Sequence, residues 1–216
     1  MTLSLHCPTV SILTIDHSGS MAADDYPPTR LDAAREAALE FTREKMRCGR
    51  TQDLVGIAAF GCTGSVVLPP TAVQRIRPFE SALAGLTVDG GTCFAAGLEA
   101  AKSAFEGRSS LGLFDWLLAK PKAAACDPSM QKHVVFLSDG HPADEAPAKR
   151  VSQKLKDAGV IIETVGIGGA PSDVGEEILK AMASLDENGN PRYRFIGDRQ
   201  ALLQDFRAKA AMLKVC

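Results

Sequence analysis

The sequence has no long apolar run and no excess of charge of either sign. No stretch reaches the roughly 18 consecutive apolar residues that a membrane-spanning helix requires, so we expect no membrane association. Lys and Arg number 24 against 26 Asp and Glu, and the formal net charge is -2. This balance excludes a strongly basic surface that would attract nucleic acid or an anionic membrane. Residues 1–9 lack a basic segment followed by an apolar one, which argues against a secretory signal and predicts a cytoplasmic location.

The cysteines show no paired spacing. There are 6 of them, at positions 7, 48, 62, 93, 126 and 216, and no two form a C-x-x-C motif. The usual spacing of zinc ligands is therefore absent. Scattered cysteines of this kind are typical of reduced thiols in a cytosolic protein.

The composition that is present suits one globular domain. The chain has 216 residues, of which 45% are hydrophobic and 23% are charged, values that are ordinary for a folded α/β protein. This length allows a sizeable core in one domain and is short for two. No repeat, low-complexity tract or linker interrupts the chain. We therefore predict a single domain over residues 1–216, with its core at about 9–213.

Apolar strands alternate with amphipathic helices along the sequence. Strands are predicted at 10–15, 54–60, 65–68, 133–138, 160–165 and 193–196, and helices at 29–46, 71–83, 94–105, 145–158, 174–185 and 199–213. This alternation predicts an α/β fold with a doubly wound, mainly parallel six-stranded sheet and helices on both faces. The turn at 61–64 makes 65–68 the one antiparallel edge strand.

The connection at 107–132 is the least regular part of the chain. It is too long for a simple turn, and 111–119 could form one short helix with the only tryptophan, Trp116, on its apolar side. The connection follows a helix that leads away from Thr92, so we expect it at the amino ends of the strands. Trp116 then either packs in the core or anchors a partner there.

Oxygen-bearing side chains follow the ends of predicted strands. Asp16, Ser18 and Ser20 follow the strand at 10–15, at the edge where open α/β sheets place ligands. Thr92 follows the glycine pair 90–91, and Asp139 follows the strand at 133–138. Singly, each of the five would be read as a helix cap or turn residue. Together they offer the hard oxygen donors that Mg²⁺, Mn²⁺ and Ca²⁺ prefer.

This ordered set resembles the von Willebrand factor type A domain with its metal-ion-dependent adhesion site. That site combines Asp-x-Ser-x-Ser with a distant Thr and a distant Asp, and all five positions match here. The alternating strands and helices extend the resemblance over nearly the whole chain. It implies a Rossmann-like fold and an intact site for Mg²⁺, with Mn²⁺ or Ca²⁺ as alternatives. It also implies a binding module, without catalytic residues, whose metal accepts an Asp or Glu side chain of a protein partner.

Three loops are predicted to form the rim that selects this partner: 24–28, 141–145 and 168–173. His17 lies between two ligand positions and is expected to point away from the metal. His141 is expected to be an exposed loop residue or to contact the partner's acid. Cys93, next to Thr92, is expected to be the only cysteine near the site, as a small packing residue.

Other functions remain open from the sequence. Size and architecture resemble stand-alone bacterial type A proteins, which favours a role in a stress-response or signalling complex. A magnesium-dependent phosphatase or phosphoryl-transfer enzyme could use a similar sheet. Haloacid-dehalogenase-like enzymes, however, place a second Asp as general acid where this chain has Ser18, a poor acid at neutral pH. A structural subunit of a larger assembly, in which the metal serves stability alone, is the third possibility.

Overall fold

The computed structural model describes residues 8–107 and 129–212 and contains one mixed sheet with the strand order β3-β2-β1-β4-β5-β6. β1 (Thr9–Asp16) pairs in parallel with β2 (Leu54–Phe60) on one side and β4 (Gln131–Ser138) on the other. β5 (Ile161–Ile167) and β6 (Tyr193–Ile196) continue the parallel arrangement. β3 (Gly64–Ala72) is antiparallel to β2. The predicted fold class is confirmed.

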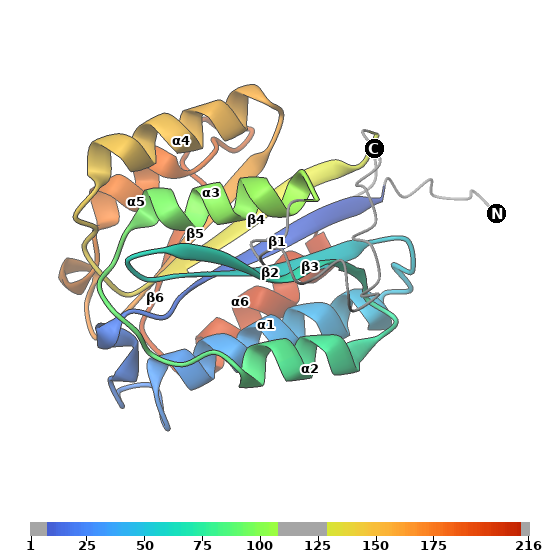
Figure 1. The fold of residues 1–216 in the computed structure, drawn as a ribbon, viewed down its shortest axis with the longest axis horizontal. Helices are drawn as coiled ribbons and strands as arrows, with labels where there is room; N and C mark the ends of the chain where they lie inside the picture. The colour runs from blue at the N-terminus through green and yellow to red at the C-terminus, as the bar shows by residue number, and fades with distance from the viewer. Residues whose placement is uncertain (1–7, 108–128, 213–216) are drawn as a thin grey trace, which may run out of the picture.

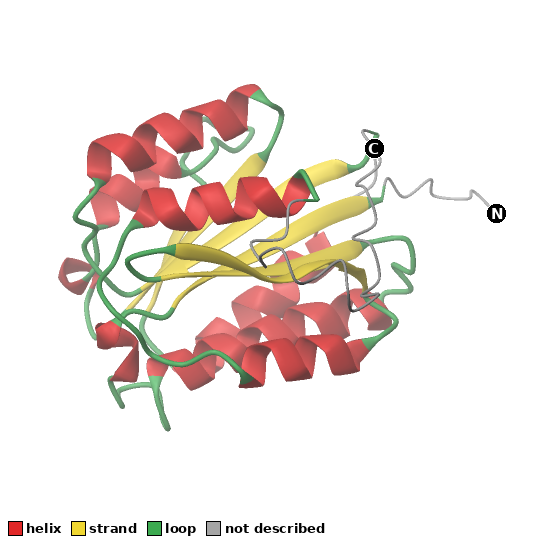
Figure 2. Ribbon diagram, in the orientation of Figure 1, coloured by secondary structure: helices red, strands yellow, loops and turns green. Residues whose placement is uncertain are grey.

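Helices cover both faces of this sheet (Figures 1 and 2). One face carries α1 (Arg30–Arg47), α2 (Ile76–Ala84) and α6 (Arg199–Met212), and the other carries α3 (Phe94–Phe105), α4 (Glu145–Asp157) and α5 (Glu176–Met182). Leu13 and Ile15 of β1 belong to the first core, whereas Val10 and Ile12 belong to the second. All of β1 is buried, as expected for a central strand of a parallel sheet that is covered on both faces.

The predicted bounds of two helices are wrong. The helix predicted at 71–83 begins only at Ile76, because Thr71 and Ala72 still belong to β3 and pair with β2. Prolines in a strand are tolerated at a sheet edge, and β3, at the edge, contains Pro69 and Pro70. The helix predicted at 174–185 is the shorter α5. It stops because the chain turns extended at Ala183 and the Ser184 amide donates to the Ile162 carbonyl at 2.8 Å.

Some predictions fall on parts of the chain that the structure does not describe. The short helix at 111–119 and Trp116 lie outside the described residues. Cys48, Cys62 and Cys93 are free thiols. The other three cysteines lie outside the described ranges.

The hairpin between β2 and β3 packs directly against the backbone of α3 at Gly64. A Cβ atom at this position would lie 2.0 Å from the Ala96 carbonyl oxygen. We expect Gly64→Ala to lower the free energy of unfolding by about 2 kcal/mol, because backbone must move to admit the methyl group. Urea unfolding followed by circular dichroism measures the change. Gly85→Ala is the matched control, since a Cβ there meets its nearest atom at an ordinary 3.6 Å. Equal stability of the two variants would contradict the close approach.

Candidate metal centre

The candidate site lies where the direction of sheet winding changes. β1 and β4 are neighbours in the sheet, and the chain leaves β1 into α1 on one face and β4 into α4 on the other. Such a switch point leaves a crevice at the carboxyl ends of the strands, where ligands bind in open α/β sheets. Asp16 is the last residue of β1, and Asp139 directly follows β4. The topology therefore brings the two carboxylates, which are far apart in sequence, to one edge.

The loop before α3 is tied to the first motif by backbone hydrogen bonds. The Gly19 amide donates to the Gly90 carbonyl at 3.0 Å, and the Asp89 amide donates to the His17 carbonyl at 2.8 Å. These contacts hold the segment that ends in Thr92 beside the Asp-x-Ser-x-Ser loop.

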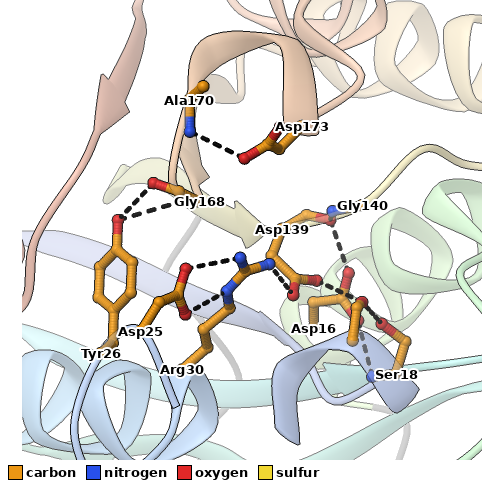
Figure 3. A network of polar contacts seen from close by, with 12 residues as sticks. Asp16, Ser18, Asp25, Tyr26, Arg30, Asp139, Gly140, Gly168, Ala170 and Asp173 are labelled. Carbon is orange, nitrogen blue, oxygen red and sulfur yellow. Dashed lines mark hydrogen bonds and ion pairs between the residues drawn. The ribbon is translucent and has the colours of Figure 1, made fainter. Parts of the chain in front are cut away.

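The structure brings the five predicted residues together, and Asp16, Ser18 and Asp139 of this set are labelled in Figure 3. The Ser20 hydroxyl donates to Asp139 Oδ1 at 2.8 Å and lies 3.2 Å from the Ser18 hydroxyl. The Ser18 amide donates to Asp16 Oδ1 at 2.8 Å. Thr92 reaches the same point, because a Cβ on Gly140 would lie 3.2 Å from Thr92 Oγ1 and 3.8 Å from Ser20 Oγ. The Thr92 hydroxyl has no hydrogen-bond partner within the described part of the chain.

Asp16 is a fully buried carboxylate. It accepts a hydrogen bond of 2.6 Å from the Ser138 hydroxyl, which in turn accepts from the Gly140 amide at 3.2 Å. Burial raises the pKa of Asp16 to about 6, although hydrogen bonds from Ser138 and Ser18 partly oppose this shift. The ionised form of Asp16 is therefore destabilised by its surroundings, and a nearby cation would stabilise it.

Arg30 is a residue of the site that sequence reasoning missed. Its Nη1 donates to Asp139 Oδ2 at 2.8 Å, while Nε and Nη2 donate to the two oxygens of Asp25 at 2.8 and 2.7 Å (Figure 3). The hydrogen bonds from Arg30 lower the pKa of Asp25. Asp25 was expected only as part of the rim. Nothing in the spacing of Arg30 and Asp139 predicts their contact.

Ser138 and Asp144 also have roles that the sequence did not indicate. The sequence predicts Ser138 only as the last residue of a strand, yet its hydroxyl orients Asp16. Asp144 was expected at the rim, but its carboxylate accepts from the Phe94 and Ala95 amides at 2.9 and 2.8 Å. It thus accepts from the first amides of α3 and fixes the helix that begins two residues after Thr92.

The prediction that only Cys93 lies near the site is wrong. Cys62, in the turn before β3, accepts a hydrogen bond of 3.0 Å from the Gly91 amide, next to Thr92. The β2–β3 hairpin folds over this loop, so the sequence distance of 29 residues gave no hint. His17 does turn away from the five residues, since its Nδ1 lies 2.9 Å from the Thr87 carbonyl oxygen. His141 is exposed.

The donor set fits a hard divalent cation. Two carboxylates and three hydroxyls converge, and Mg²⁺, Mn²⁺ and Ca²⁺ take oxygen ligands of these kinds. Within residues 8–107 and 129–212, no group of three or more His, Cys, Asp or Glu side chains is placed to hold a metal.

The fold and this arrangement define a class of protein. The sequence profile of the von Willebrand factor type A domain matches residues 11–141, which spans the five residues of the site. The chain belongs to the von Willebrand factor type A domain family. Domains of this fold often mediate protein–protein interactions.

Curated relatives cover most of this chain. A UPF0353 protein of Mycolicibacterium vanbaalenii is 27% identical over 197 residues, covering 82% of this chain and 52% of the relative. A UPF0353 protein of Mycolicibacterium paratuberculosis is 28% identical over 222 residues, covering 95% of this chain and 59% of the relative. The chain thus spans little more than half the length of these curated relatives.

Solved structures share the fold. The von Willebrand factor type A protein from Catenulispora acidiphila is 25% identical with a TM-score of 0.67, covering 96% of this chain and 43% of that one. The VWA domain of SpRpn10 is 20% identical with a TM-score of 0.65, covering 94% of this chain and 95% of that one. No helix among the described residues is long and apolar enough to cross a membrane.

Proposed function

We propose that this domain binds a partner protein through a divalent cation, Mg²⁺ in the first instance, held by Asp16, Ser18, Ser20, Thr92 and Asp139. The observation that supports this is the convergence of two carboxylates and three hydroxyls at the switch point of the sheet. When bound, the ion would offer an electrophilic position to an Asp or Glu side chain of the partner. The loops at 24–28, 141–145 and 168–173 would form the rim around it.

The chain's own residues prepare the site for such an ion. Ser138 holds Asp16 in place, and the Ser20 hydroxyl holds Asp139 at 2.8 Å. The Thr92 hydroxyl has no competing hydrogen bond from the described residues. Two carboxylates balance the charge of a divalent ion, and the three hydroxyls add none. The ion would therefore keep an affinity for a further anionic oxygen.

We propose a binding role without catalysis. Ser18 stands where a general acid would be needed for phosphoryl transfer, and its hydroxyl contacts Ser20 rather than a base. The mycobacterial relatives support a bacterial setting, and the proposed partner belongs to a stress-response or signalling complex of the cytoplasm.

Thr92→Ala tests the metal site. The change deletes a hydroxyl that makes no hydrogen bond within the described part of the chain, so we expect the fold to be unaffected. The dissociation constant for Mn²⁺, measured by calorimetry, should rise roughly tenfold. Thr63→Ala, in the exposed turn before β3, is the matched control and should bind like the wild type. Equal affinities in all three proteins would contradict the assignment.

The binding role is tested by affinity capture from source cells in Mg²⁺ and again in EDTA. We expect a partner that is retained only with the metal and is lost with Thr92→Ala. A complex that survives EDTA, with a melting temperature that falls, would favour the structural subunit. Magnesium-dependent hydrolysis of p-nitrophenyl phosphate that is lost in Asp16→Asn would favour the enzyme.

A further inference from the structure

Asp139, one of the two carboxylates of the site, already pairs with a cation of the chain, Arg30. Arg30 Nη1 and Asp139 Oδ2 are 2.8 Å apart, and the Asp139 side chain is completely buried. Its other oxygen, Oδ1, accepts from Ser20. Both oxygens of this proposed metal ligand therefore have donors from within the protein.

The position of Arg30 is fixed from several sides. It is the first residue of α1, and its amide donates to the Ala23 carbonyl at 2.9 Å. Asp25 accepts hydrogen bonds from Nε and Nη2 of Arg30 in a bidentate ion pair, and the Arg30 side chain is only 13% exposed. Planar pairs of this kind are geometrically specific. The guanidinium is therefore held against Asp139 by the surrounding structure.

We propose that Arg30 is a built-in counter-ion of the metal centre that stabilises Asp139 without metal and lowers the affinity for a divalent cation. The proposal rests on the proposed function, because it assumes that the ion binds at the same five residues. Two cations beside one buried carboxylate repel each other, and the repulsion is poorly screened where water is excluded. Asp25 weakens this repulsion, because its negative charge partly offsets the positive charge of Arg30.

The counter-ion role predicts opposite effects from two variants. Arg30→Gln removes the competing charge, so the dissociation constant for Mg²⁺ should fall about tenfold, whereas the melting temperature of the metal-free protein should also fall. Asp25→Asn leaves the full guanidinium charge to Asp139, so the dissociation constant should rise severalfold. Arg30→Lys keeps the charge and should stay within about threefold of the wild type. Calorimetric titration of each variant with Mg²⁺ alone, and thermal unfolding in EDTA, provide the readouts.

Arg43→Gln is the matched control. Arg43 lies on the same helix and pairs with Glu40 at 3.1 Å, far along the chain from the site, so its loss should not change the affinity for Mg²⁺. Weaker or unchanged binding in a folded Arg30→Gln protein would overturn the proposal. Should that variant not fold, tighter binding by Asp25→Asn would overturn it equally. Absence of binding in the wild type and in every variant would instead refute the metal site itself.

Discussion

Replacing Asp16 by Asn is expected to weaken the proposed metal binding strongly and, at the same time, to stabilise the metal-free protein. Affinity for Mg²⁺ should fall roughly 100-fold or more, because a charged ligand is lost. At pH 7 the free energy of unfolding should rise by up to about 3 kcal/mol. That figure converts the rise of the Asp16 pKa from 3.8 to about 6 at about 1.4 kcal/mol for each pH unit. Burial of the charge is the cause.

The neutral side chain can keep the contacts of the acid. The Ser18 amide donates to Asp16 Oδ1, and the Asn oxygen would accept the same bond. The Asn amide would donate to the Ser138 hydroxyl, which now donates to Oδ2. The exchange therefore removes a buried charge and keeps both contacts, although the Ser138 hydroxyl proton loses its carboxylate acceptor, and this loss offsets part of the gain.

The gain in stability should depend on pH in a defined direction. The folded pKa of Asp16, about 6, lies above the unfolded value of 3.8, so the native state binds more protons between these values. As the pH falls through 6, the Asp16 carboxyl of the wild type takes up a proton, and the destabilisation caused by its buried charge decreases. The advantage of Asp16→Asn should thus be full at pH 7 and vanish near pH 4. Urea unfolding in EDTA at both pH values measures it.

Asp24→Asn is the control for a change of net charge. Asp24 is exposed in the neighbouring loop, so its neutralisation should alter stability by less than about 0.5 kcal/mol at either pH. A wild-type protein that is more stable than Asp16→Asn at pH 7 without metal would show that the surroundings of Asp16 favour its charge.

The convergence of the five proposed ligands could be predicted because each follows a strand or a glycine pair. The rule that parallel strands end at one edge brings Asp16 and Asp139 together without knowledge of the packing. The contacts that tune them could not be predicted. Arg30 and Asp139 are 109 residues apart, and Ser138 occupies an ordinary strand position. Such contacts depend on where α1 enters the fold, which local periodicity does not determine.

The boundary between β3 and α2 shows the same limit in the fold. Thr71 and Ala72 suit a helix start in isolation, yet they pair with Val55 and Leu54 of β2. A neighbouring strand satisfies backbone groups that a helix would otherwise satisfy, and the sequence of 71–83 alone does not reveal that neighbour. The strand β1, with Val10, Ile12, Leu13 and Ile15 directly before a turn sequence, had no such ambiguity.

Loss of the buried ion pair between Lys45 and Asp53, at the amino ends of the strands, is expected to lower the stability of the protein strongly. Lys45 Nζ lies 2.5 Å from Asp53 Oδ2 and 2.9 Å from Thr9 Oγ1, and both charged side chains are completely buried. Asp53 also accepts from the Thr9 amide at 3.0 Å. The pair thus joins α1 to the start of β1. Lys45→Met should lower the free energy of unfolding by about 3–5 kcal/mol, because it breaks a fully buried ion pair and removes the Lys45 charge from beside a buried carboxylate.

The double variant Lys45→Met, Asp53→Asn separates the loss of the pair from the loss of one partner. With both charges gone, we expect it to be more stable than Lys45→Met alone, since replacing a whole buried pair is often close to neutral. Lys149→Met, which removes one member of an exposed pair with Glu145, should change stability by less than about 1 kcal/mol. Thermal and urea unfolding of the three variants measure these differences. A double variant as unstable as Lys45→Met would mean that the hydrogen bonds to Thr9 require a carboxylate at position 53. Affinity for Mg²⁺ should stay unchanged in every folded variant, because the pair lies at the amino ends of the parallel strands and Asp16 lies at the carboxyl end of β1.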